Sequence, residues 1–249
     1  MVSPGWRISV AQGFSPVAIF PYSMFTLERV VPWGRSYDEY CRMFALTATD
    51  LGGRLLGCGD GPASFNAAAT RGGTSIVSCD PIYEFDSEQI RRRIDETVEE
   101  ILEQTRRNYT EFVWTEIASV EELRRVRLDA MQQFLADYEV GKSEGRYIEA
   151  SLPALPFADQ SFDLALCSHF LFLYSDQLGE PFHDTAVLEL ARVAREVRIF
   201  PLLALGGAQS PFVPTLTASL RKSGYAVTLE RVPYEFQRGG NEMMRIRQG

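Results

Sequence analysis

Three glycines separated by single residues, Gly57, Gly59 and Gly61, form the most distinctive chemical pattern in the chain. Glycine has no Cβ, so such a turn can bend sharply and bring backbone amides close to a ligand. Asp80 follows 23 residues after Gly57, at the end of an apolar stretch and just before Pro81. A carboxylate at this distance can accept hydrogen bonds from both hydroxyls of a ribose. The spacing predicts a nucleotide-binding turn and a ribose-binding acid, ionised at neutral pH because an unperturbed aspartate has a pKa near 4.

Cys167, Ser168 and His169 end another apolar stretch, over residues 162–167. Histidine has the side-chain pKa nearest neutrality, so His169 is the candidate general base, with a partly buried supporting histidine as the alternative. His183, at the start of a predicted helix, is a candidate substrate contact or a helix-cap residue. A Ser–His–Asp hydrolase is disfavoured, because the chain contains no Gly-x-Ser-x-Gly motif.

Three other side chains are candidates for the same region. Tyr22 and Tyr174 are candidate walls of a substrate pocket, with packing in the core or at its rim as the alternative. Cys58 lies close to a predicted helix N-terminus, which lowers the pKa of a thiol; packing inside the turn is its alternative role.

The elements that must hold these residues alternate between strands and helices. The stretch 54–80 predicts a strand, the glycine-rich turn, a helix of small residues and a second strand ending at Asp80. Two further helices are expected at 184–195 and 212–223. The remaining strands are expected at 146–150, 162–167, 196–205, 225–236 and 242–247, the last two as a hairpin around Gln-Arg-Gly-Gly-Asn. This order predicts a Rossmann-like α/β fold: a seven-stranded, mostly parallel sheet with an antiparallel C-terminal hairpin and helices on both faces.

We predict one domain over residues 1–249, with two additions. Residues 1–35, rich in proline and aromatic residues, are expected to pack on the domain. Residues 86–145 hold 15 acidic and 9 basic residues, which is −6 of the net charge of −8. Apolar residues recur there at helical spacing, which predicts a helical insertion between the second and third strands: Ile90, Ile94, Val98 and Ile101, then Val126, Ala130, Phe134 and Tyr138. These helices are either a solvated surface pair or a lid or homodimer contact over the cofactor crevice.

Composition narrows the class of protein. The net charge of −8 and pI near 5.0 argue against nucleic acid or an anionic membrane as the main partner. No apolar run approaches the ~18 residues that span a bilayer, and the first 20 residues do not resemble a signal peptide. Four cysteines without a CxxC pair, and only two histidines, argue against disulfides and a metal site. We therefore expect a soluble, cytoplasmic protein that acts on a small molecule.

Three motifs resemble those of class I S-adenosylmethionine (SAM)-dependent methyltransferases that act on small molecules. Leu55–Gly61 resembles the glycine-rich first motif of that family, and Cys79–Pro81 resembles the acidic end of its second strand. Leu155–Phe157 followed by Ser161–Asp163 resembles the stretch that leads into its fourth strand. With the terminal hairpin, the resemblance covers about residues 36–85 and 146–249.

The resemblance implies SAM as cofactor and a set of cofactor contacts: Gly57, Cys58, Gly59, Gly61, Asp80 and Pro81 around the methionine and ribose, Ser151 and Leu152 near the adenine, and Cys167 beside them. The family usually has an acidic residue two positions before the first glycine of the motif, and here Leu55 or Gly57 occupies that position, depending on the register. Ser151 stands where the family often has aspartate. Two alternatives stay open: a nicotinamide-dependent oxidoreductase using the same turn, and a SAM-binding or interaction module without catalysis.

Overall fold

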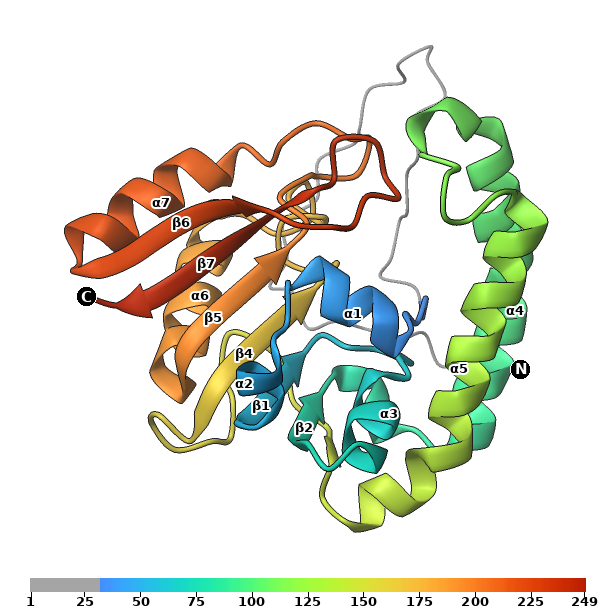
Figure 1. The fold of residues 1–249 in the computed structure, drawn as a ribbon, viewed down its shortest axis with the longest axis horizontal. Coiled ribbons are helices and arrows are strands. Elements are labelled where there is room, and N and C mark those ends of the chain that lie inside the picture. The colour runs from blue at the N-terminus through green and yellow to red at the C-terminus, as the bar shows by residue number, and fades with distance from the viewer. Residues whose placement is uncertain (1–31) are drawn as a thin grey trace.

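A seven-stranded sheet forms the centre of the computed structural model, which describes residues 32–249 (Figure 1). The strands lie in the order β3-β2-β1-β4-β5-β7-β6, and β7 runs against the other six. Their bounds are β1 Arg54–Cys58, β2 Ser75–Cys79, β3 Tyr147–Ile148, β4 Phe162–Ser168, β5 Ala194–Phe200, β6 Tyr225–Arg231 and β7 Glu242–Gln248. The predicted Rossmann-like sheet with an antiparallel C-terminal hairpin is confirmed.

The central strand β1 pairs with β2 on one side and with β4 on the other. The chain runs outward from β1 to β2 and β3, and then returns across β1 to continue with β4. In open α/β sheets, the reversal of strand order leaves a crevice at the carboxyl ends of the two strands concerned, and ligands bind there. The glycine-rich turn that follows β1 and the segment that follows β4 meet at this place.

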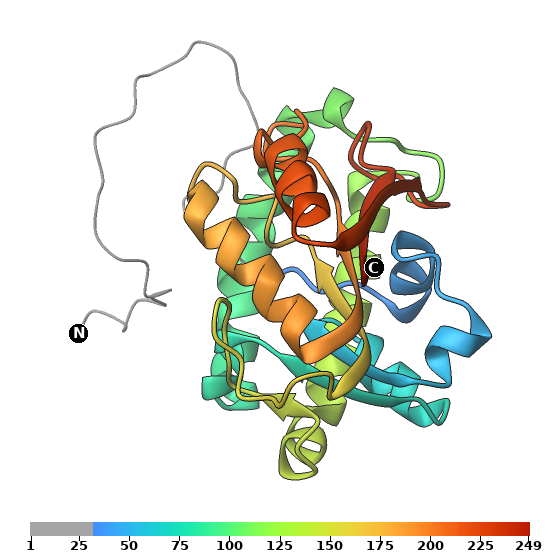
Figure 2. The same cartoon turned by 90° about the vertical axis from the view of Figure 1, so that its left-hand side faces the viewer.

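Helices cover both faces of the sheet because its strands are apolar on both faces. Leu56 and Ala165 pack in the core beneath α6 and α7, whereas Leu55 and Leu164 pack in the core beneath α1 and α3. Figure 2 shows α6 and α7, in orange, on the near side of the sheet. The helix bounds are α1 Tyr37–Met43, α2 Ala48–Leu51, α3 Phe65–Arg71, α6 Glu180–Val193 and α7 Phe212–Lys222.

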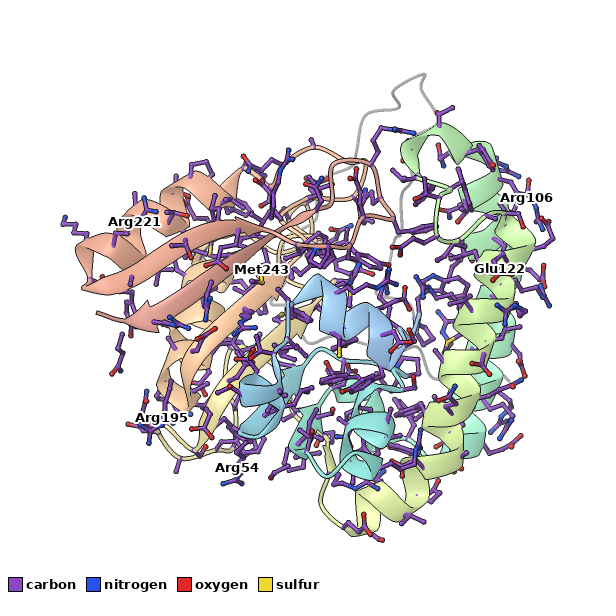
Figure 3. All side chains as sticks on the ribbon, in the orientation of Figure 1. Arg54, Arg106, Glu122, Arg195, Arg221 and Met243 are labelled. Atoms are coloured by element: carbon purple, nitrogen blue, oxygen red, sulfur yellow. The ribbon has the colours of Figure 1, made fainter. Side chains whose placement is uncertain are left out.

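The predicted helical insertion is present as two long helices, α4 (Ser87–Arg107) and α5 (Val120–Ser143), between β2 and β3 (Figure 1). Ser119 accepts a hydrogen bond from the backbone of Glu122 and thereby caps α5. Figure 3 shows Arg106 and Glu122 on the outer side of this pair, where charged side chains are solvated. Short 3-10 helices precede and follow α4, at Pro81–Glu84 and Tyr109–Glu111.

Of the four residues expected on the buried stripe of α5, Ala130, Phe134 and Tyr138 are buried and Val126 is not. Val126 is only half-buried, and the fully buried side chain is that of Arg127. Arg127 follows Leu123 by four residues and precedes Ala130 by three, so helical geometry places all three on one face. A charged residue therefore occupies a buried position at which the helical periodicity predicts an apolar residue.

Several elements are shorter than expected, for local reasons. The strand expected at 196–205 ends at Phe200, because Pro201 has no N–H to give to a ladder. β6 ends at Arg231, the last residue paired with β7. Among residues 32–249, no helix has both the length and the apolar character needed to cross a membrane.

Candidate functional site

Position 57 must be a glycine because the side chain of Asp60, in the same turn, leaves no room for a Cβ. A Cβ on Gly57 would lie 1.8 Å from Oδ2 of Asp60, because the Asp60 side chain folds back over β1. Asp60 is buried and accepts two hydrogen bonds: Oδ1 from the hydroxyl of Tyr40 at 2.9 Å, and Oδ2 from the hydroxyl of Ser78 at 2.6 Å. The turn is thus fixed to α1 and to β2 through one carboxylate.

Burial raises the pKa of Asp60 to about 6, against the lowering effect of its bonds to Ser78 and Tyr40. The position two residues before the glycine motif, where the family that the sequence resembles usually has an acidic residue, holds no acidic residue in this chain. Leu55, one of the two residues that could occupy that position, is a core residue. An acidic side chain is nevertheless present at the turn, supplied from within the motif. The signal available in the sequence was the aspartate between Gly59 and Gly61.

Asp80 lies directly after β2, beside the same turn. Its Oδ2 accepts a hydrogen bond from the Gly61 amide at 2.9 Å, and its Oδ1 accepts one from the Ile82 amide at 2.9 Å. The hydroxyl of Tyr83 donates to the Gly61 carbonyl at 2.8 Å, so Gly61 is held on both sides. The acid expected to bind ribose therefore also organises the turn.

The expectation of an unperturbed Asp80 is wrong. Burial raises its pKa to about 6, and the two backbone amides offset only part of that effect. Asp80 still carries its charge in most molecules at pH 7, because that pH is about one unit above its pKa.

The surroundings of Gly61 and Asp80 fit a bound ribose. An ionised carboxylate offers about four lone-pair positions, and the described residues use two of those on Asp80. Gly61 has φ +53°, and a Cβ there would meet no atom of residues 32–249 within 4 Å, so among these residues the backbone borders open space. Gly59 also has positive φ, and its amide donates to the Cys79 carbonyl, which joins the turn to the end of β2.

The two cysteines predicted near the cofactor, Cys58 and Cys167, are buried in the sheet, in register with each other. A hydrogen bond to Cys79, followed by burial, raises the pKa of Cys58 well above its usual range, and burial raises that of Cys167 to about 12. The lowered thiol pKa considered for Cys58 is wrong. Both residues act in this structure as small packing residues beneath the turn.

The residues expected near the adenine follow the edge strand β3. The Asp80 amide donates to the Ile148 carbonyl, so β3 ends level with β2. Ser151 is exposed, whereas Leu152 packs into the core. Pro81, at the start of the 3-10 helix, is half-buried. Of these three, Ser151 is the one whose side chain is open to solvent.

His169 lies at the carboxyl end of β4. The glycine-rich turn lies on the other side of the point between β1 and β4 where the strand order reverses, here called the sheet switch. Its backbone has φ +50°, its amide donates to the Phe200 carbonyl, and its Nδ1 lies 2.9 Å from the hydroxyl oxygen of Ser168. Burial, with the positive charges of Arg35 and Arg127, lowers the pKa of His169 well below 6.5. The imidazole is therefore neutral at pH 7 and can accept a proton only weakly unless a negative charge joins it.

The other aromatic candidates lie in different surroundings. His183 is fully buried, and its two ring nitrogens lie 3.0 and 2.9 Å from the carbonyl oxygens of Gly179 and Leu171. Tyr174 is also buried, and its ring packs near Phe170. Tyr22 lies outside the described residues.

A buried ion pair lies next to this site, and sequence reasoning missed it. Nη1 of Arg127 donates to Oε2 of Glu39 at 2.6 Å, and the hydroxyl of Tyr234 donates to Oε1 of Glu39 at 2.9 Å. Glu39 also closes the capping box of α1 with Ser36. Its pKa falls to about 2, because the favourable charge and hydrogen bond of Arg127 outweigh the cost of burial.

The insertion spans the carboxyl ends of the strands. At one end, Tyr83 packs against Phe134 of α5, beside the glycine-rich turn. At the other end, the Val113 amide donates to the Phe236 carbonyl in the loop between β6 and β7. The Glu39–Arg127 pair joins the middle of α5 to α1. The insertion thus lies along the same end of the sheet as the turn, Asp80 and His169.

Comparison with known proteins gives one close relative and one family match. The chain is 33% identical over 222 residues to "Uncharacterized protein MJ0045" of Methanocaldococcus jannaschii, covering 89% of this chain and 97% of that one. A family model described as "Methyltransferase domain" matches residues 112–197. That match includes β3, β4 and α6 but not the glycine-rich turn or Asp80.

Solved structures resemble the chain more distantly. Magnesium protoporphyrin IX methyltransferase of Synechocystis, solved with bound SAM, is 11% identical with a TM-score of 0.46, over 86% of this chain and 78% of that one. A putative SAM-dependent methyltransferase of Methanococcus maripaludis is 11% identical with a TM-score of 0.40, over 85% and 83%.

Proposed function

Because the chain belongs to the family of the M. jannaschii protein and carries a class I SAM-dependent methyltransferase domain, we propose that it methylates a small molecule. When bound, SAM supplies the methyl group, as an electrophile attached to a sulfonium. The protein's task in such a displacement is mainly to position the acceptor in line with that group. The residues described above are suited to this task.

In this proposal Asp80 accepts hydrogen bonds from the ribose hydroxyls with the lone pairs that Gly61 and Ile82 leave free. Gly61 borders the open space in which the cofactor lies, and its place is set by Asp80 and Tyr83. Ser151, exposed after β3, is the candidate contact to the adenine. Asp60 does not contact the cofactor in this proposal but positions the turn through its hydrogen bonds with Tyr40 and Ser78.

We place the acceptor over the carboxyl end of β4, between His169 and α5. His169 is neutral and is the candidate base for an acceptor that carries a proton. His183 and Tyr174 are buried, so we assign them a role in supporting the residues around the acceptor.

A homodimer through the insertion also remains a prediction. The molecular mass in solution, compared with the 28.0 kDa of one chain, tests it.

The observation that carries the proposal is the hydrogen bond between Asp80 and the Gly61 amide, which joins the acidic strand end to the glycine-rich turn at the sheet switch. Thermal unfolding with SAM, S-adenosylhomocysteine or NAD provides the test. We expect both sulfur ligands to raise the melting temperature and NAD to leave it unchanged. Stabilisation by NAD alone would instead favour an oxidoreductase.

Methyl transfer itself is tested by incubating the full chain with radiolabelled SAM and a panel of small acceptors. We expect label in at least one acceptor. Strong binding of SAM with no transfer across a broad panel would favour a binding module without catalysis.

A further inference from the structure

Arg127, in the middle of α5, is fully buried yet only partly paired. Nη1 donates to Glu39, but Nε and Nη2 have no hydrogen-bond partner among the described residues. Buried polar groups in proteins are nearly always hydrogen-bonded, and the rare exceptions call for an explanation. An unpaired edge of a guanidinium is a costly feature unless something else binds it.

Arg198 shows how the same fold treats a buried arginine with a structural role. Its Nε donates to Glu196 at 2.6 Å, its Nη1 to the Phe44 carbonyl at 2.7 Å, and its Nη2 to Asp50 at 2.9 Å. All three nitrogens are paired, although the side chain is as deeply buried as that of Arg127. The unpaired edge of Arg127 is therefore not a general consequence of burying arginine in this protein.

A second arginine adds to the unbalanced charge. Arg35 precedes α1, and its Nη1 donates to the Trp33 carbonyl, while its buried Nε has no partner in residues 32–249. Burial and the charge of Arg127 lower the pKa of Arg35, so the two cations disfavour each other. Two arginines against the single carboxylate of Glu39 leave one positive charge at this place.

We propose that Arg127, assisted by Arg35, binds a carboxylate of the methyl acceptor; this rests on the proposed function. The Nε–H and one Nη2–H bond of a guanidinium point the same way, so this edge fits the two oxygens of a carboxylate. One negative charge also balances the one uncompensated positive charge, which a phosphate dianion does not.

The position of the two arginines suits an acceptor held for methyl transfer. Their charges reach His169, at the carboxyl end of β4. The rings of Phe200 and Tyr234 pack against each other, and that of Phe200 also packs against His169, so the neighbourhood is aromatic as well as cationic. Because the free nitrogens of Arg127 are buried, a carboxylate bound to them forms its ion pair away from water.

Benzoate, an aromatic monocarboxylate, is a suitable probe, and benzamide is its neutral counterpart. Both are titrated without SAM into the full-length protein, with calorimetry for affinity and the histidine ring NMR signals for location. His169 and His183 are the only histidines of the chain. Benzoate is expected to shift the His169 signals and to leave those of His183 unchanged.

The decisive variant is Arg127→Lys, which keeps the charge and one bond to Glu39 but loses the two-nitrogen edge. Arg198→Lys is the matched control, since it alters a buried arginine that is already fully paired. We expect Arg127→Lys to weaken benzoate binding by at least about tenfold, the scale of a charge-assisted pair, and Arg198→Lys to leave it unchanged. Urea unfolding of both variants checks that each is folded.

Three results would overturn the proposal: equal affinity for benzoate and benzamide, equal benzoate binding by wild type and Arg127→Lys, or tighter binding of inorganic phosphate than of benzoate. Since SAM is absent from these titrations, they separate this inference from the proposed function. Benzoate binding without SAM binding would refute methyl transfer and leave the anion site unaffected. SAM binding without benzoate binding would refute the anion site and leave the proposed methyl transfer unaffected.

Discussion

Replacing Asp60 by asparagine is expected to change the stability of the protein in opposite directions at high and low pH. Asp60 lies buried in the glycine-rich turn and has a pKa of about 6, compared with an ordinary value of 3.8. The folded state therefore binds this proton more tightly than the unfolded chain. Between pH 3.8 and about pH 6 the folded protein binds more protons than the unfolded chain. The contribution of Asp60 to stability therefore falls as the pH rises and is lowest above about pH 6.

The size of the effect follows from the shift in pKa. A shift of about two units corresponds to about 3 kcal/mol at neutral pH, since one unit is ~1.4 kcal/mol. Asparagine removes that penalty but gives up about one hydrogen bond, worth ~1 kcal/mol: Ser78 already accepts from Asn66, and an asparagine amide would turn a second donor toward it. Asp60→Asn should thus be about 2 kcal/mol more stable than wild type at about pH 8 and about 1 kcal/mol less stable at about pH 3.

Urea unfolding of both proteins at a series of pH values measures this difference directly. Asp80 and His169 also have shifted pKa values, but they are present in both proteins, so their contributions largely cancel in the comparison. Asp176→Asn, at an exposed carboxylate, is the control and should show a flat difference. A flat difference for Asp60→Asn as well would refute the buried, hydrogen-bonded role assigned to Asp60.

Three further predictions concern the same region. Glu39→Gln should lower the free energy of unfolding by about 3 kcal/mol, because it leaves the Arg127 charge buried without its partner; a loss below about 1 kcal/mol in urea would contradict this. Gly57→Ala should destabilise the protein by roughly 2–4 kcal/mol, since the new Cβ displaces the Asp60 carboxylate. Gly57→Ala should cost less in an Asp60→Ala background than in wild type, and simple additivity of the two changes would count against the clash. The ring signals of His169 should show no titration between about pH 8 and pH 6.5, because burial and two nearby arginines lower its pKa; an NMR midpoint at or above 6.5 would exclude that environment.

Features set by short stretches of sequence could be predicted well. The apolar spacing in residues 86–145 predicted the helices of the insertion, and the turn chemistry before Glu242 predicted the hairpin. The number of strands and the antiparallel hairpin could be predicted from the succession of apolar stretches and turn residues. These features depend on neighbours within a few residues or on rules common to all such folds.

The contacts that shape the site could not be predicted in this way. Glu39 and Arg127 are 88 residues apart, and nothing near either residue identifies the other as its partner. The relevant signal in the sequence was the charged residue Arg127 on the apolar face of α5, where the prediction had placed Val126. The expectation of an unperturbed pKa for Asp80 was wrong for a related reason, because burial depends on elements that pack from elsewhere in the chain.

Calorimetric titration of SAM into wild type and Asp80→Ala tests the central claim most directly. Asp163→Ala, at the opposite end of the sheet, is the matched control. We predict that Asp80→Ala weakens SAM binding by about 10- to 100-fold, the scale of losing charge-assisted hydrogen bonds, and that Asp163→Ala has no effect. Unchanged affinity in a folded Asp80→Ala variant would contradict the assignment of the cofactor site to the glycine-rich turn and Asp80.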